Sequence, residues 1–137
     1  MAEFDKYKAT KTFELYSDFS SAFSIHPETK QLNRATDVIA VKRSIRNIIL
    51  TDKYERPYSD MDGGVRGLLF ELNTPQMRST IKTKIINVLE LYEPRCKIVD
   101  THVQVSDDEH DLIVTLYFYV INIQDIQTYS LKVSRIR

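Results

Sequence analysis

The fold is decided by residues 110–121, which read HDLIVTLYFYVI and follow the two-residue period of a β-strand. Every second side chain from Leu112 to Val120 is apolar, and those between them, from Ile113 to Ile121, are largely apolar as well. A strand that is apolar on both faces is usually covered on both sides. We therefore expect this strand to be central in its sheet or to face a partner.

Two further strands are predicted beside it. Residues 97–106 alternate between two faces, one of which carries Val99, Thr101, Val103 and Val105. The acidic turn 107–109 joins this segment to 110–121 as a hairpin. The last strand, 128–137, carries Tyr129, Leu131 and Val133 on one face.

Helices precede the sheet. In residues 36–51 apolar side chains recur at spacings of three and four, and Thr36 or Asp37 can cap the helix start. A shorter helix over 65–72 follows Gly63-Gly64, which permits a sharp turn. The second long helix has Thr74 as its cap and Pro75 as its first residue, and Pro94 ends it. The sequence thus predicts an α+β fold, with two or three helices packed on a small antiparallel β-sheet.

Residues 1–33 are the least regular part of the chain. Six aromatic side chains recur there without helical spacing: Phe4, Tyr7, Phe13, Tyr16, Phe19 and Phe23. This density favours an extended N-terminal arm that packs on its own domain or on a partner, with a short strand at 22–25, over a purely solvated tail. We therefore divide the chain into an arm, 1–33, and an α+β domain, 34–137.

Composition narrows the function classes. The 137 residues carry 19 basic and 19 acidic side chains, so the chain lacks the positive charge of a non-specific nucleic-acid binder. Cys96 is the only cysteine, which excludes an intramolecular disulfide and fits a reducing compartment. The first residues lack the pattern of a signal peptide, and no apolar run is long enough to cross a bilayer. We expect neither export by a signal of its own nor a membrane partner.

Motifs for chemistry are scarce. The glycines at 63, 64 and 67 are not followed by Lys-Ser or Lys-Thr, so they do not form a Walker-type phosphate loop. Arg95 can lower the pKa of Cys96, but the sequence places no histidine beside it, and a structural cysteine is the favoured interpretation. No spacing indicates a metal site or a cofactor. Carboxylates at Glu55, Asp60, Asp62, Glu71 and Glu93 leave a small peptidoglycan-cleaving, lysozyme-like enzyme as the alternative.

Three stretches together resemble a known family. They are Arg43–Thr51 with Glu55–Ser59, then Gly63–Glu71, and then Leu91–Arg95, which ends a predicted helix. In this order and spacing they are similar to the baseplate wedge family of contractile phage tails. Its relatives include a type VI secretion baseplate component, and it has carried a lysozyme label. The resemblance covers residues 36–126.

The resemblance implies a structural protein without catalytic activity, located in the tail baseplate of a virion and assembled in the host cytoplasm. Family members sit in six copies around the tail tube, placed by their partners rather than by self-association. Their Glu-Pro-Arg motif, here Glu93, Pro94 and Arg95, contacts the core bundle of the baseplate wedge. Their sheet resembles that of the tail sheath subunit and templates the first sheath ring.

Physical reasoning leaves two interpretations of each surface. Glu93 and Arg95 can project from a proline-stopped corner toward a partner, or form an exposed ion pair worth about 0–1 kcal/mol. If Arg95 serves docking, we expect Arg95→Ala to leave the isolated fold almost unaffected. The last strand, with Tyr129, Leu131 and Val133, can accept a sheath strand at its edge or simply complete its own sheet. For the function of the whole protein, a third interpretation beside a structural baseplate protein and a lysozyme-like enzyme is an unrelated adaptor domain that shares the fold.

Overall fold

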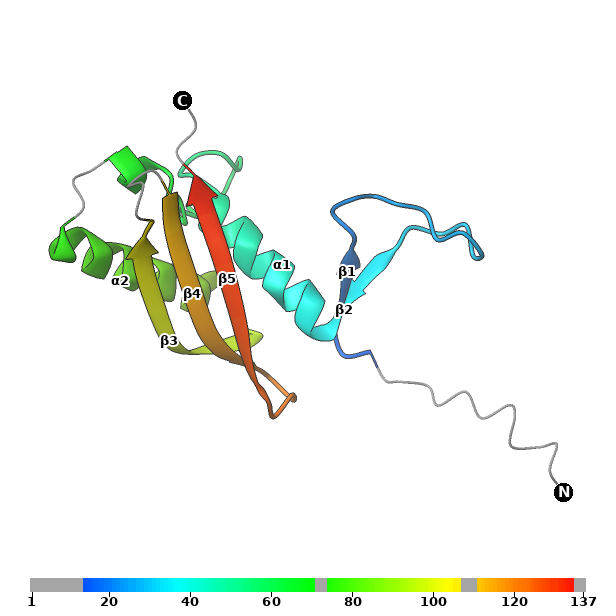
Figure 1. Cartoon of the computed structure of the whole chain (residues 1–137). Coiled ribbons are helices and arrows are strands. Elements are labelled where there is room, and N and C mark those ends of the chain that lie inside the picture. Colours follow the sequence, from blue (N-terminus) through cyan, green and yellow to red (C-terminus); the bar gives the residue numbers. More distant parts are fainter. Residues whose placement is uncertain (1–13, 71–73, 107–110, 135–137) are drawn as a thin grey trace, which may run out of the picture. The chain divides into compact units, whose positions relative to one another are not determined.

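The computed structural model describes residues 14–70, 74–106 and 111–134. Its strands are β1 (Ser17–Phe19), β2 (Arg34–Thr36), β3 (Cys96–Val105), β4 (Asp111–Val120) and β5 (Ile126–Ser134). Its helices are α1 (Asp37–Leu50), α2 (Pro75–Tyr92) and the short 3-10 helix η2 (Gly67–Phe70). Two α-helices with a two-stranded and a three-stranded antiparallel sheet confirm the predicted α+β class (Figure 1). The chain divides into two compact units between Ala40 and Val41.

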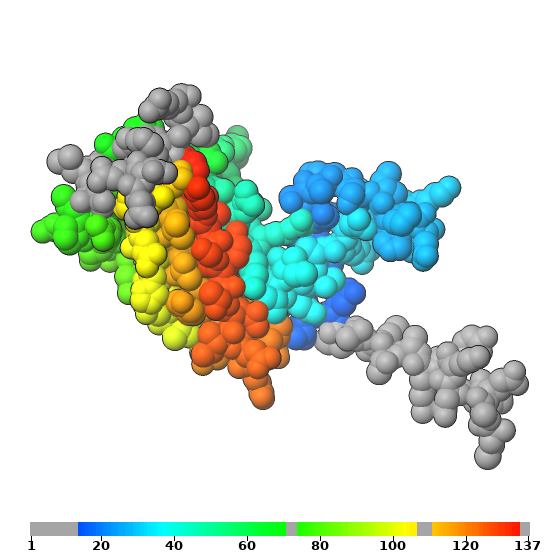
Figure 2. Space-filling view, in the orientation of Figure 1, coloured from blue at the N-terminus to red at the C-terminus, as the bar shows by residue number. Residues whose placement is uncertain are grey.

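The larger unit is built on the sheet β3-β4-β5, in which β4 is central as predicted. The inward side chains of β4 are at most 1% exposed, and they are Leu112, Val114, Leu116, Phe118 and Val120. The helices cover the inward face of the sheet (Figure 1). Figure 2 shows the outer face, where β3, β4 and β5 lie side by side with no helix over them.

The two long helices present predicted apolar stripes to the sheet. The Thr74 hydroxyl accepts a 3.2 Å hydrogen bond from the Met77 N–H and caps α2, with Pro75 in its first turn. The buried residues of α2 recur every four positions, at Met77, Ile81, Ile85 and Leu89. In α1 the core residues are Val41, Ile45, Ile48 and Ile49.

The predicted face of β3 was wrong at Val99. The pairing with β4 shifts between Ile98 and Asp100, so Val99 is the extra residue of a β-bulge. Its side chain is 54% exposed, and the inward positions before it are taken by Cys96 and Ile98, opposite Val120 and Phe118. An inserted residue reverses the alternation, which a period-two pattern cannot reveal.

The smaller unit is folded back on itself rather than simply extended. β1 pairs antiparallel with β2, and one isolated bridge joins Ile25 to Leu32. The strand expected at 22–25 was therefore wrong, because the strand lies at Ser17–Phe19. Phe4, Tyr7 and Phe13 lie outside the described residues. Whether 1–33 and 34–137 act as arm and domain stays a prediction.

Asp37 does not cap α1 through its carboxylate, as one of the two expected caps would. Its Oδ1 accepts the N–H groups of Leu15 and Tyr16 at 2.9 and 3.2 Å, and its φ is 47°. The side chain therefore ties down the residues before β1. Across the described ranges, no helix is both long and apolar enough to cross a membrane.

Candidate docking surface

The corner between α2 and β3 is fixed by backbone hydrogen bonds. The N–H of Glu93 donates to the Leu89 carbonyl at 2.9 Å, and the N–H of Cys96 donates to the Glu93 carbonyl at 3.2 Å. Pro94 stands exposed between them and cannot continue the helix. The chain therefore leaves α2 in one direction, and Glu93, Pro94 and Arg95 form a rigid corner, which we call the docking corner.

Glu93 and Arg95 form a forked ion pair at this corner. Arg95 Nε donates to Glu93 Oε1 at 2.6 Å and Nη2 donates to Oε2 at 2.8 Å. Glu93 is 1% exposed and the Arg95 side chain 32% exposed. The expectation that both side chains project was wrong for Glu93, because its carboxylate turns inward and is also hydrogen-bonded by Ser44 of α1.

The environment keeps the buried carboxylate charged. Burial alone raises the pKa of Glu93, but hydrogen bonds from Arg95 and Ser44, with the positive charge of Arg95, more than offset it. The net result is a pKa below the ordinary value of 4.5. Glu93 is thus an anchor that orients the Arg95 fork, and it presents no acid with a raised pKa for catalysis.

Cys96 has the properties of a structural residue. Burial raises the pKa of its thiol to about 12, and the charge of Glu93 acts in the same direction, outweighing the opposite effect of Arg95. The Sγ atom lies 3.5 Å from the Glu93 carbonyl oxygen, to which it donates. Arg95 therefore does not activate the thiol. Within the parts of the chain that the structure describes, no three potential ligands gather into a metal site.

Exposed apolar side chains precede the docking corner in the chain and lie at the adjoining end of the sheet. Leu91, 71% exposed, lies two residues before Glu93, and the N–H of Ile121 donates to the Arg95 carbonyl at 2.9 Å. Tyr119 and Ile126 are paired neighbours on the outer sheet face at the same end of β4. We call Leu91, Tyr119, Ile121 and Ile126 the apolar rim. These four residues were not among the predicted site residues, although the apolar outer face at the end of 110–121 was a sequence signal for them.

The last strand uses its apolar side chains internally. Leu131 and Val133, 5% and 3% exposed, lie opposite Val114 and Leu112 of β4 and complete the core. Tyr129 is half-buried, which raises its pKa, and the nearby charge of Arg46 partly opposes that rise. These three side chains hold the sheet together, so only the outer backbone edge of β5 is left for another strand.

The carboxylates weighed for glycoside hydrolysis are mostly engaged. Glu93 binds Arg95, Asp62 pairs with Lys84 at 2.9 Å, and Glu55 accepts the Asp52 N–H at 2.9 Å. Asp60 is exposed, and Glu71 lies outside the described residues. The described part of the chain thus gives no pair of opposed, unengaged carboxylates among these candidates.

Comparison with known proteins finds similarity both in sequence and in fold. The chain is 31% identical over 123 residues to the baseplate wedge protein gp25 of Enterobacteria phage T4, covering 88% of this chain and 92% of that protein. No family model matches the chain. A Geobacter sulfurreducens protein named as a tail lysozyme shares the fold with a TM-score of 0.63 and 19% identity, covering 71% of this chain and 89% of that one. A chain of the six-fold symmetrised anti-feeding prophage baseplate does so with a TM-score of 0.60 and 18% identity, covering 89% and 87%.

Proposed function

The chain belongs to the family of the phage T4 baseplate wedge protein gp25, and from this we propose that it is a structural component of a virion tail baseplate that docks on wedge proteins through Glu93, Pro94 and Arg95. The observation that carries the proposal is the Arg95 fork, which is held by a buried carboxylate at a proline corner. Exposed Leu91 lies close by in the chain, and exposed Ile121 is hydrogen-bonded to the Arg95 carbonyl.

The arrangement suits protein docking on physical grounds. Glu93 fixes two of the N–H donors of Arg95, so the guanidinium loses little conformational freedom when a partner binds. Arginine and aromatic side chains, here Arg95 and Tyr119, are enriched at the centres of protein interfaces. The partner we propose is the helical core of the wedge.

A pair of alanine variants at the end of α2 tests this docking. Leu91 is exposed and apolar, whereas its neighbour Glu90 is exposed and charged, and alanine suits the helix at both positions. We expect Leu91→Ala to weaken binding to purified wedge subunits about tenfold or more, and Glu90→Ala to leave it unchanged. Equal binding of the wedge subunits by both variants would show that the docking corner is not part of the interface.

We also propose that the outer edge of β5 accepts a strand of the tail sheath subunit and so starts the first sheath ring. Support comes from the sheet order, in which β5 is an edge strand whose Leu131 and Val133 side chains already face the core. A further strand would add through backbone hydrogen bonds. Placement of several copies around the tail tube would come from the wedge partners.

Cysteine cross-linking distinguishes an added strand from a chance contact. Ser130 lies on β5 and Thr115 lies directly opposite it on β4. An added strand would place a residue about 5 Å from position 130 but about 10 Å from position 115. In assembled particles Ser130→Cys should cross-link to sheath subunits carrying cysteines in their edge strands, and Thr115→Cys should not. Cross-linking from neither position, or from both equally, would reject the added strand.

We propose no catalytic role. The engaged carboxylates of Glu93, Asp62 and Glu55 support this, and the likeness to the tail lysozyme, at 19% identity, is a likeness of fold. Purified protein should release no fragments from peptidoglycan. Release that disappears in a Glu55→Gln or Asp60→Asn variant would overturn the proposal.

A further inference from the structure

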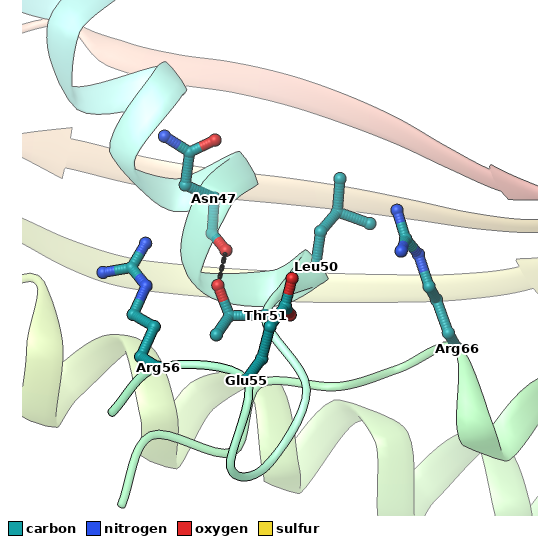
Figure 3. A pocket seen from close by; sticks show the side chains of 6 residues that line it. All are labelled: Asn47, Leu50, Thr51, Glu55, Arg56 and Arg66. Carbon is teal, nitrogen blue, oxygen red and sulfur yellow. Dashed lines mark hydrogen bonds between the residues drawn. The ribbon is translucent and has the colours of Figure 1, made fainter. Parts of the chain in front are cut away.

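A polar pocket lies at the C-terminal end of α1, apart from the docking corner. Its volume is about 340 Å³, and it is lined by Asn47, Leu50, Thr51, Glu55, Arg56 and Arg66 (Figure 3). Asn47 follows Ser44, the residue that binds Glu93, by about one turn of helix. The pocket joins two of the three stretches on which the family resemblance rests, whereas the docking corner lies in the third.

Two glycines bring the second stretch against the helix end. A Cβ on Gly63 would lie 1.8 Å from the Ile48 carbonyl oxygen, and one on Gly64 would lie 2.1 Å from Asp52 Oδ1. Neither glycine has a positive φ, so they serve close approach rather than the sharp turn expected from the sequence. Lys84 of α2 holds this segment by donating to the Gly64 carbonyl at 3.2 Å. The backbone before Arg66 is therefore fixed.

The two arginines of the pocket are exposed and available. Across the described residues, neither the Arg56 nor the Arg66 side chain makes a hydrogen bond or an ion pair. Figure 3 shows them on opposite sides of the pocket, with Glu55 and Thr51 between them. The Glu55 carboxylate accepts the Asp52 N–H, and Thr51 donates to the Asn47 carbonyl. The pocket thus has an arginine fork on each of two sides.

We propose that this pocket binds a carboxylate side chain from an acidic segment of a partner protein. Arginine forks bind carboxylates through paired hydrogen bonds, and the volume is in the range of sites that hold small groups. Leu50, partly buried between the polar residues, suits the methylene groups of an Asp or Glu side chain. The negative charge of Glu55 repels a polyanion such as nucleic acid, and the zero net charge of the chain also disfavours nucleic acid as the partner.

Titration with an acetylated, amidated hexaglutamate peptide tests the pocket on the full chain. We expect NMR shifts at the Asn47 side-chain amide and at Nε–H of Arg56 and Arg66, weakened by added salt. Arg56→Gln and Arg66→Gln should each lower the affinity about tenfold. Arg34→Gln, which removes an exposed arginine from the smaller unit, is the matched control and should bind like the original protein. Arg66→Lys keeps the charge but loses the fork, so it should also bind less tightly.

Three results would overturn the proposal. The first is an absence of peptide-induced shifts at the pocket in low salt, and the second is an equal loss of affinity in Arg34→Gln. The third is tighter binding of inorganic phosphate or of a duplex DNA oligonucleotide than of the peptide, which would point to a free anion or to nucleic acid. The Arg56 and Arg66 side chains are exposed and have no hydrogen bond or ion pair among the described residues, so unchanged urea unfolding of both variants would show that any loss is local.

Discussion

Arg95 and Glu93 are joined by two hydrogen bonds of 2.6 and 2.8 Å, and the carboxylate end of this pair is buried while the guanidinium end is partly exposed. The same arginine therefore serves two purposes. It neutralises a charge inside the domain, and its outer side forms part of the proposed docking surface.

Removing Arg95 should therefore weaken the isolated fold, contrary to the sequence-based expectation. Arg95→Ala leaves the buried Glu93 without its charged partner, which should cost about 1.5–3 kcal/mol of unfolding free energy. Urea denaturation measures this cost. Arg66→Ala, which removes an exposed arginine without an ion pair in the described ranges, should cost close to nothing. Equal stability of the two variants would contradict a structural role for the fork.

Acid should destabilise the domain through Glu93. Although burial opposes it, the hydrogen bonds and charge at the site hold the folded-state pKa below the ordinary value of 4.5. The resulting stability is present above that value and is lost as the pH falls through the lower, folded-state pKa. Unfolding midpoints measured between pH 7 and pH 2 should fall less steeply for Glu93→Gln than for the original protein. Parallel profiles would refute this.

Gly63 should not tolerate a side chain. A Cβ at this position meets the backbone oxygen of Ile48, which cannot move away without disturbing α1. We expect Gly63→Ala to lower stability by about 1–3 kcal/mol. Gly67→Ala is the control, because its Cβ would meet nothing within 4 Å. Thermal unfolding midpoints of the two variants measure the difference. A Gly63→Ala protein as stable as the original would show that the C-terminal end of α1 can shift to make room for the methyl group.

Thr101→Val should stabilise the protein. The Thr101 hydroxyl is buried without a hydrogen-bond partner in the described structure, and valine replaces it with a methyl group of similar size. Relief of this unsatisfied group should add about 1 kcal/mol. Thr115→Val, on the outer face and close to the Ser130 hydroxyl, should not gain stability. Chemical denaturation can measure both, and a loss at Thr101 would indicate a bound water.

Cys96 should resist modification in the folded protein. Burial and the charge of Glu93 raise its pKa to about 12, and only the thiolate reacts quickly. Iodoacetamide at pH 8 should label native Cys96 at least about 100-fold more slowly than urea-unfolded protein. Fast labelling without unfolding would show that the core around β3 opens.

The sequence was most informative where one pattern had one physical reading. Thr74 and Pro75 marked the start of α2, and the alternation of residues 110–121 predicted a strand that is central or faces a partner, which the structure shows to be the central strand β4. Both signals are local, because capping and strand alternation depend on neighbours along the chain. The resemblance added the family, which the relative from phage T4 then supported.

The missed features depend on contacts between distant segments. The bulge at Val99 is set by the register with β4, and the use of Asp37 by Leu15 and Tyr16 is set by the folding of the N-terminal unit. Nor did local spacing indicate that Ser44 would receive Glu93 or that Gly63 would touch Ile48. Periodicity describes one element at a time, so pairs like these become visible only in three dimensions.

The extra residue at Val99 has a consequence for crowding. It kinks β3, and a kinked edge is a poor template for backbone pairing. Neighbouring copies would then be unable to form a continuous intermolecular β-sheet, because a further strand could add at β5 but not at β3. If the proposed baseplate holds several copies of the chain, this edge would limit their association into fibres.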